Sequence, residues 1–122
     1  MDQADGELAW TDLPGQNRIY RFVWNGMLQG DMANKENRIH PTQKPVKLYE
    51  WLLNKYAKPG DTILDTHAGS ASSLIACYNT NHKYVGFEID KYYYEKAKQR
   101  LETAEAQINI FNLMEQETND RP

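Results

Sequence analysis

Residues 62–73 have the sequence TILDTHAGSASS, and the expected fold is built outward from them. The apolar run before Asp65 predicts a buried strand, the small residues after it predict a tight turn, and residues 74–78 predict a helix. Small residues at such a turn let a ligand approach the backbone. The free N–H groups at the start of the helix favour electron-rich or anionic ligand atoms.

An acidic residue follows this turn at a sequence spacing that is typical of nucleoside-binding folds. The next apolar run, residues 84–87, ends at Glu88, which lies 19 positions after Gly69. Nucleoside-binding folds place a carboxylate on the ribose hydroxyls at a spacing of roughly 20 residues. The two features together predict a cofactor cleft for a ligand that carries a nucleoside.

The length and composition indicate one globular domain spanning residues 1–122. Hydrophobic residues make up 40% of the 122 and charged residues 25%, which is not the profile of a disordered chain. No apolar run approaches the roughly 20 residues of a membrane span, and the first residues do not have the basic-then-apolar pattern expected of a secretion signal. Cys77 is the single cysteine, which excludes an internal disulfide and a Cys-rich metal site. We expect a cytoplasmic protein without a metal ion.

The net charge of −3 is unevenly distributed along the chain. Residues 1–17 carry four acidic and no basic side chains, residues 18–58 carry eight basic and three acidic, and residues 59–122 carry six basic and ten acidic. A basic middle segment suits a phosphate backbone, although a solvated surface gives the same pattern. Lys35 and Arg38 are the candidate DNA contacts within it.

The first third of the chain predicts a hairpin and a loop. Residues 8–24 have the pattern of an antiparallel hairpin with a Pro-Gly turn, and Tyr20, Phe22 and Trp24 alternate onto one face. This aromatic row suits either packing or base stacking. Residues 25–39 are polar and lack an apolar period, so they predict a mobile loop.

Three helices and two parallel strands are expected in the remainder. Pro45 suits the first position of a helix that ends before Pro59-Gly60, and a second helix joins the strands at 62–65 and 84–89 in a βαβ unit. Asp90 is a candidate N-cap for a third helix, whose buried stripe is Tyr93, Ala97, Leu101 and Ala104. Residues 107–111 suit a helix end or a strand, and residues 112–122 a frayed tail.

Two motifs in this order resemble a known family. Residues 38–45, RIHPTQKP, precede a helix; DTHAGS follows at 65–70, and GFEID closes the set at 86–90. Together they resemble the S-adenosylmethionine-binding part of the β-class amino-methylating DNA methyltransferases, which modify adenine N6 or cytosine N4, and in particular their phage and prophage members. The resemblance implies part of a three-layer αβα Rossmann-like fold, with residues 40–111 forming the cofactor-binding part.

The resemblance also implies roles for individual residues. Asp65, Gly69 and Ser70, with Ser72 beside them, would line the methionine end of S-adenosylmethionine. Glu88 would accept both ribose hydroxyls, and Ile89 would lie against the adenine ring. The opposite side would be closed by Thr42, Lys44 and Pro45, with Lys44 near the cofactor carboxylate.

The sequence departs from the family pattern at three positions of the turn. The family has Pro-Phe where this chain has Thr66-His67, and Gly where it has Ala71. His67 is therefore a candidate cofactor contact, with a structural role as the alternative.

No catalytic residue is assigned, because the family's Asp/Asn/Ser-Pro-Pro-aromatic tetrapeptide is absent. No two prolines of this sequence are adjacent. We therefore expect the cofactor-binding C-terminal part of a DNA methyltransferase, inactive by itself. In the family sheet, strands from the other half lie between the Asp65 strand and the hairpin, so we expect pairing with a second copy or with that half.

Two other functions stay open from the sequence. A non-catalytic DNA-binding or assembly module of prophage origin is compatible with the basic middle segment and the absent tetrapeptide. A fragment of a dinucleotide-binding oxidoreductase is compatible with the strand-turn-helix-strand-Glu order. However, the turn lacks Gly-x-Gly-x-x-Gly, and that class does not explain residues 40–45.

Overall fold

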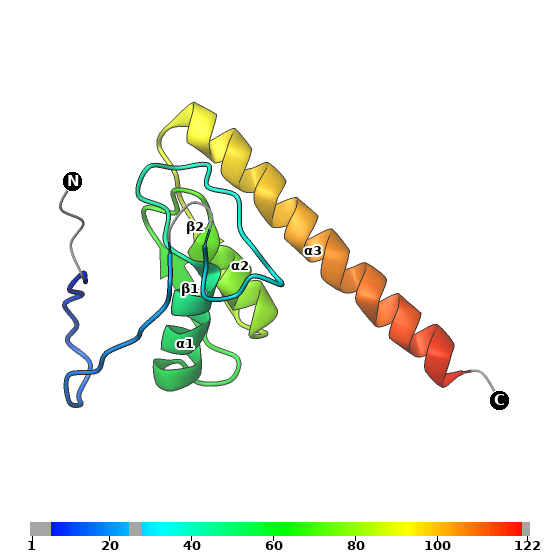
Figure 1. Cartoon of the computed structure of the whole chain (residues 1–122), viewed down its shortest axis with the longest axis horizontal. Helices are drawn as coiled ribbons and strands as arrows, with labels where there is room; N and C mark the ends of the chain where they lie inside the picture. The colour runs from blue at the N-terminus through cyan, green and yellow to red at the C-terminus, as the bar shows by residue number, and fades with distance from the viewer. Residues whose placement is uncertain (1–5, 25–27, 121–122) are drawn as a thin grey trace.

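The computed structural model describes residues 6–24 and 28–120, and in these parts three helices and two strands alternate (Figure 1). They are α1 (Val46–Tyr56), β1 (Thr62–Asp65), α2 (Ser72–Asn79), β2 (Lys83–Gly86) and α3 (Lys91–Asn119). The two strands pair in parallel, with Thr62 opposite Lys83 and Asp65 opposite Gly86. Since α2 connects them, the predicted βαβ unit and the α/β class are confirmed.

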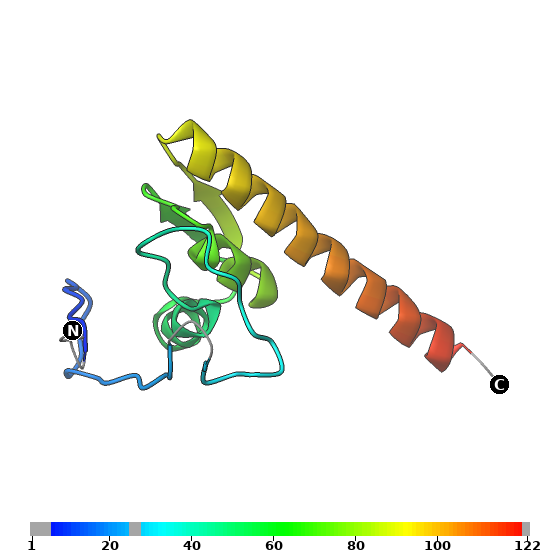
Figure 2. The same cartoon turned by 45° about the horizontal axis from the view of Figure 1, so that its top comes forward.

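The core of the described residues is centred on α2. All six residues from Ser72 to Cys77 are buried, and α2 contacts α1, α3 and both strands. The small residues at its start allow this, because they let the neighbouring elements approach closely. Gly86 of β2 shows how tight the packing is: a Cβ atom there would lie 2.5 Å from Leu74 Cδ1. Figure 2 shows α3 passing this layer and continuing away from it.

One face of the sheet is covered and the other is exposed. Exposure alternates along both strands. Tyr84 packs against the cluster of Ala71, Leu74 and Ala97 on the α2 side. Leu64 and Val85 point the other way and are 61% and 47% exposed. An apolar face of this kind is normally covered in a finished α/β fold.

Helix α1 lies where its apolar period predicted it, with one shift. Pro45 is the N-cap (φ −67°, ψ 142°) and the helix begins at Val46, so the proline lies one position earlier than expected. The helix ends at Tyr56, before Pro59-Gly60. Within the described residues, no helix is both long and apolar enough to cross a membrane.

Helix α3 begins as predicted but ends much later. The Asp90 side chain accepts a hydrogen bond from the Tyr93 backbone N–H (3.0 Å). In the predicted stripe, Ala97 is buried and Tyr93, Leu101 and Ala104 are partly buried. The prediction of a tail from 112 onward is wrong as far as Asn119, and residues 107–111 are helical. The segment contains no Gly or Pro before Pro122, so nothing in it breaks the helix. Residues 121–122 lie outside the described residues.

The predicted hairpin at 8–24 is not formed. Residues 6–23 contain no strand, and the pairing nearby is an isolated antiparallel bridge between Trp24 and Gln29. The alternating aromatics pack on a helix instead: the Tyr20 ring stacks on Trp51 of α1 at 5.2 Å and on Phe22 at 6.1 Å. A strand needs a hydrogen-bonded neighbour, and side-chain alternation alone does not supply one.

Two buried glutamines, Gln29 and Gln43, form hydrogen bonds with backbone groups of the segment predicted as a mobile loop. Residues 28–39 contain no helix or named strand, while residues 25–27 lie outside the described part. Gln29 accepts from Glu36 N (2.8 Å) and donates to Glu36 O (2.9 Å). Gln43 accepts from Ile39 N (2.8 Å) and donates to Asn37 O (3.2 Å). The mobility stays a prediction, and these contacts favour one loop conformation.

Alkaline pH is expected to destabilise the protein through Cys77. The Cys77 side chain is fully buried, and burial, followed by the Asp65 charge, raises the pKa of its thiol from 9.0 to about 11. The unfolded chain therefore ionises first, and stability present below about pH 9 is lost as pH rises toward 11. By pH 10.5 the loss should be on the order of 2 kcal/mol.

Urea unfolding of the wild type and of Cys77→Ala at pH 8 and pH 10.5 measures this loss. The variant lacks the thiol, so its free energy of unfolding should fall less between the two pH values. Burial also raises the pKa of Tyr84, whose hydroxyl donates to Glu105 in both proteins. An equal loss in wild type and variant would show that the Cys77 thiol is not responsible.

Candidate functional site

A cavity of about 350 Å³ opens at the carboxyl ends of the two strands. Asp65 ends β1, and Glu88 lies two residues after β2. One wall is the turn between β1 and α2, and the other is the segment leading into α1. The lining residues are His40, Thr42, Gln43, Lys44, Tyr49, His67, Ala68, Gly69, Ser70, Ser72, Ser73 and Glu88.

Seven of the ten predicted cofactor contacts line this cavity. They are Thr42, Lys44, His67, Gly69, Ser70, Ser72 and Glu88. The other three are not among the lining residues. Pro45 is buried as the N-cap of α1, and Ile89 is fully exposed beside the cavity. Asp65 has a supporting position.

The Asp65 carboxylate stabilises the turn through two hydrogen bonds. Its Oδ1 accepts a hydrogen bond from His67 N (3.0 Å), and its Oδ2 accepts one from the Ser73 hydroxyl. These bonds bridge the two ends of the turn. Asp65 therefore supports the cavity wall without being among the lining residues, and its contact with the cofactor stays a prediction.

Two residues of the turn have a left-handed backbone conformation. Gly69 has φ 56°, which a glycine adopts without strain, and Ala71 has φ 67° and ψ 19°. The family pattern described above has glycine at the second position. Ala71 keeps the same left-handed conformation, at a cost of roughly 1–2 kcal/mol for an alanine. Its buried methyl group, part of the core cluster, offsets some of that cost.

Glu88 forms a hydrogen bond with the turn at the cavity. Its Oε1 accepts from Gly69 N (3.0 Å) and its Oε2 from Asp90 N (3.2 Å). Each carboxylate oxygen has two lone pairs, so both oxygens can accept one further hydrogen bond. Gly69 and Glu88, which lie 19 positions apart in the sequence, are thus in direct contact at the cavity.

Lys44 supplies the positive charge of the opposite wall. Its Nζ lies 2.7 Å from a Glu7 carboxylate oxygen, and the two side chains are 34% and 70% exposed. An ion pair this open to water contributes about 0–1 kcal/mol. Another carboxylate can therefore replace Glu7 on Lys44 at little cost.

His40 is a lining residue that the sequence did not identify. Its Nδ1 accepts a hydrogen bond from Thr42 N (3.2 Å), and its ring packs against Tyr93 in a tilted arrangement, with the ring centres 4.3 Å apart. A backbone N–H can only donate, so neutral His40 carries its proton on Nε2. That nitrogen lies 3.9 Å from the position a Cβ atom would take on Gly69. His40 therefore presents an N–H donor beside the turn.

The sequence also did not identify four other lining residues, which are Gln43, Tyr49, Ala68 and Ser73. Four of the five missed residues lie within the quoted motifs, namely His40, Gln43, Ala68 and Ser73, so membership of the motif was the available signal. Tyr49 comes one turn into α1, where its apolar period predicted packing. Burial raises the pKa of the Tyr49 hydroxyl, so it stays neutral at physiological pH.

The comparisons with known proteins agree with this geometry. The family model of N6/N4 DNA methylases matches residues 9–99. The chain belongs to this DNA methylase family. The match does not favour the oxidoreductase or the non-catalytic module.

Several relatives can be named. The methylase chain is 39% identical over 71 residues to the type II methyltransferase M.HpaI of Haemophilus parainfluenzae, covering 58% of this chain and 23% of that protein. It is 34% identical over 87 residues to the type II methyltransferase M2.DpnII of Streptococcus pneumoniae, covering 71% and 32%. It thus spans about a quarter to a third of these curated relatives.

A solved structure is also similar. The crystal structure of the M1.HpyAVI–SAM complex matches with a TM-score of 0.50 and 28% identity, over 66% of this chain and 43% of that one. Together with the two-stranded parallel sheet, this similarity supports a partial Rossmann-like α/β fold for the methylase chain.

The two candidate DNA contacts lie outside the cavity. Lys35 and Arg38 are exposed on the loop before it. Arg38 places its guanidinium 4.6 Å from the centre of the Trp24 ring and donates to Trp24 O (3.1 Å). No group of three or more His, Cys, Asp or Glu side chains in the described part of the methylase could hold a metal ion.

Proposed function

We propose that the cavity beside Gly69 binds S-adenosylmethionine and that this chain provides the cofactor-binding part of a DNA methyltransferase acting on adenine N6 or cytosine N4. The observation that carries the proposal is the contact of Glu88 with the turn at Gly69, opposite Lys44 in one cavity. The cavity volume falls within the ~300–1,000 Å³ of typical ligand pockets. The related M1.HpyAVI has been crystallised as a SAM complex.

The Glu88 side of the cavity suits the nucleoside end of the cofactor. Both oxygens of its carboxylate keep acceptor capacity for a ribose hydroxyl. Ile89 beside it is fully exposed, and an adenine ring lying on it would cover this apolar side chain.

The opposite end of the cavity suits the amino acid part. The first N–H groups of α2 have no partner within the helix, and they lie at the turn. The His40 Nε2–H and the Lys44 ammonium add two further donors for a carboxylate. The cofactor carboxylate would then take the place of Glu7 on Lys44.

The bound cofactor supplies a methyl group on a positively charged sulfur. The residues of this chain hold and orient that group, which supplies the proximity that a displacement by an amine requires. The target base would be flipped out of the duplex to reach it. The sequence lacks adjacent prolines, so the tetrapeptide that polarises the amine would come from another segment. We expect no turnover from this chain alone.

Lys35 and Arg38 are the proposed DNA contacts, on a segment with eight basic and three acidic residues. Binding through phosphates weakens steeply as salt increases. A gel-shift series across salt concentrations, with Lys35→Ala plus Arg38→Ala against the wild type, tests this assignment. Equal shifts for both proteins would argue against it.

The exposed apolar face of the sheet is the proposed pairing surface. Leu64, Val85 and Phe87 are 47–61% exposed on or next to it, and each strand of the described two-stranded sheet has one open edge. We propose that a second copy or the complementary part of the enzyme pairs there. Light scattering that gives the 14.2 kDa of one compact monomer would count against a second copy.

Isothermal titration of this chain with S-adenosylmethionine tests the central proposal. We expect saturable binding with one site per chain, and no binding of NAD under the same conditions. Absence of any heat with S-adenosylmethionine, or preferential binding of NAD, would show that the cavity serves another ligand.

A further inference from the structure

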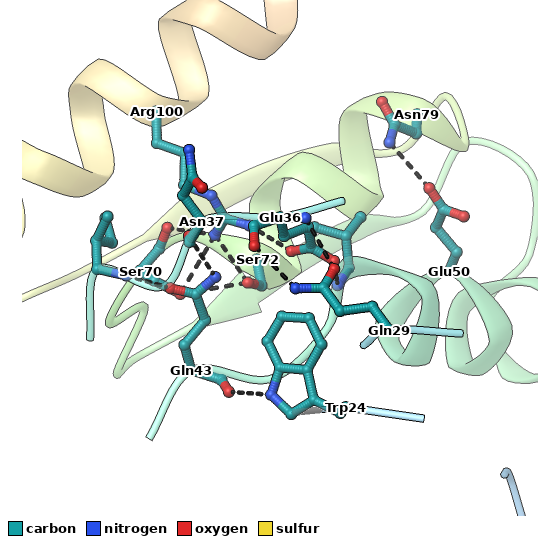
Figure 3. A network of polar contacts seen from close by, with 12 residues as sticks. Trp24, Gln29, Glu36, Asn37, Gln43, Glu50, Ser70, Ser72, Asn79 and Arg100 are labelled. Carbon is teal, nitrogen blue, oxygen red and sulfur yellow. Dashed lines mark hydrogen bonds and ion pairs between the residues drawn. The ribbon is translucent and has the colours of Figure 1, made fainter. Parts of the chain in front are cut away.

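Arg100 of α3 does not line the cavity, yet it contacts the turn on one wall and, through Glu36, the start of α1 beside the other wall (Figure 3). Its Nη1 donates to Ser70 O (2.9 Å) and to Ser72 Oγ (2.8 Å). Its Nη2 donates to Glu36 Oε1 (2.5 Å), and the other Glu36 oxygen accepts from Val46 N (3.0 Å) at the start of α1. One guanidinium therefore joins three segments that are far apart in sequence.

The side chains that make these contacts are largely buried. The Arg100 and Glu36 side chains are 16% and 15% exposed, and Ser70 and Ser72 are 4% and 3% exposed. Burial raises the pKa of Glu36 and lowers the pKa of Arg100, and the attraction between the two opposes both shifts. A buried charge that loses its partner is strongly unfavourable, so the pair is kept together.

The geometry requires an arginine. A guanidinium offers five N–H donors in a rigid planar fork, so one edge can hold the Ser70 carbonyl while the other holds a carboxylate. A lysine keeps the charge but has a single nitrogen, which cannot reach both partners in fixed directions. The side chain therefore determines how far the Ser70 turn lies from the start of α1.

We propose that Arg100 is a positioning residue for the amino acid end of the cofactor site, an inference that rests on the proposed function. Ser70 and Ser72 belong to the turn on one wall, and Lys44 stands two residues before Val46 on the other. The Arg100–Glu36 pair fixes these two walls relative to each other. On the nucleoside side, the Glu88 carboxylate accepts its hydrogen bonds from Gly69 N and Asp90 N instead.

Two ligands separate positioning from a general loss of stability. S-Adenosylmethionine carries the amino acid part, and 5′-methylthioadenosine has the same nucleoside and sulfur without it. In Arg100→Lys we expect binding of S-adenosylmethionine to weaken about tenfold, and that of methylthioadenosine less than about threefold. Glu36→Gln keeps an acceptor for Val46 N. It should likewise weaken the binding of S-adenosylmethionine more than that of methylthioadenosine. Lys98→Met, exposed on the same helix, should bind both ligands as the wild type does.

Hydrogen exchange adds a measurement that needs no ligand. In Arg100→Lys, exchange should speed up at residues 70–73 and at Val46, while the β1 amides stay protected. Equal weakening of both ligands in Arg100→Lys and Glu36→Gln, or unchanged exchange at Val46, would overturn the positioning role. If the wild type binds no S-adenosylmethionine but the exchange pattern appears, the proposed function fails and the coupling between the walls stands.

Discussion

Replacing Glu88 by glutamine is expected to weaken the binding of S-adenosylmethionine by about 100-fold, since hydrogen bonds to a charged group contribute roughly 1.5–3 kcal/mol each. In the proposed complex both carboxylate oxygens of Glu88 accept a ribose hydroxyl. Each also accepts a backbone N–H, from Gly69 and from Asp90. A glutamine has one oxygen, so its NH₂ group would face one of these N–H donors. The variant thus loses both the charge and one of the two acceptors.

The same substitution at Glu102 is the matched control. Glu102 is exposed on α3, away from the cavity, so Glu102→Gln should bind the cofactor as the wild type does. Titration calorimetry on the three proteins measures the effect, with circular dichroism showing that each is folded. If Glu88→Gln binds within about threefold of the wild type, less than 1 kcal/mol, the carboxylate does not hold the ribose.

The parts of the fold that the sequence predicted are those determined by short stretches of chain. The strand ending at Asp65, the turn of small residues and the buried helix after it follow from polarity and residue size over residues 62–78, and all three are present. The sequence assigned Gly69 and Glu88 to one cleft, and the structure joins them by a hydrogen bond. The Asp90 cap is likewise a local signal.

The features that the sequence did not predict depend on partners distant in the chain. Residues 18–24 alternate as a strand does, but Tyr20 stacks on Trp51, and among the described residues the segment pairs through the single Trp24–Gln29 bridge. The Arg100–Glu36 pair joins positions 64 residues apart, and both residues look like ordinary helix and loop charges in the sequence. Tyr49 enters the cavity lining because α1 packs beside the turn.

Replacing Leu74 by alanine is expected to destabilise the protein by about 2–5 kcal/mol, which is the usual cost for a buried leucine. Within the described residues the buried apolar side chains are Ala71, Leu74, Ile75, Ala76, Cys77 and Ala97. Leu74 is therefore one of two large aliphatic side chains in this core. It also contacts Gly86 of β2, so its removal opens a space between α2 and the sheet. Small domains are marginally stable, so this loss is a large fraction of the total.

Leu113→Ala is the control, because Leu113 is 61% exposed on α3 whereas Leu74 is 7% exposed. The same atoms are removed in both variants, so the difference between them measures burial alone. Urea unfolding followed by circular dichroism should place the Leu113→Ala midpoint near that of the wild type and the Leu74→Ala midpoint far below it. Equal midpoints for the two variants would mean that α2 is not the centre of the core. The turn at its start would then lack the rigid support that the cofactor site requires, because its N–H donors are fixed by the packing of this helix.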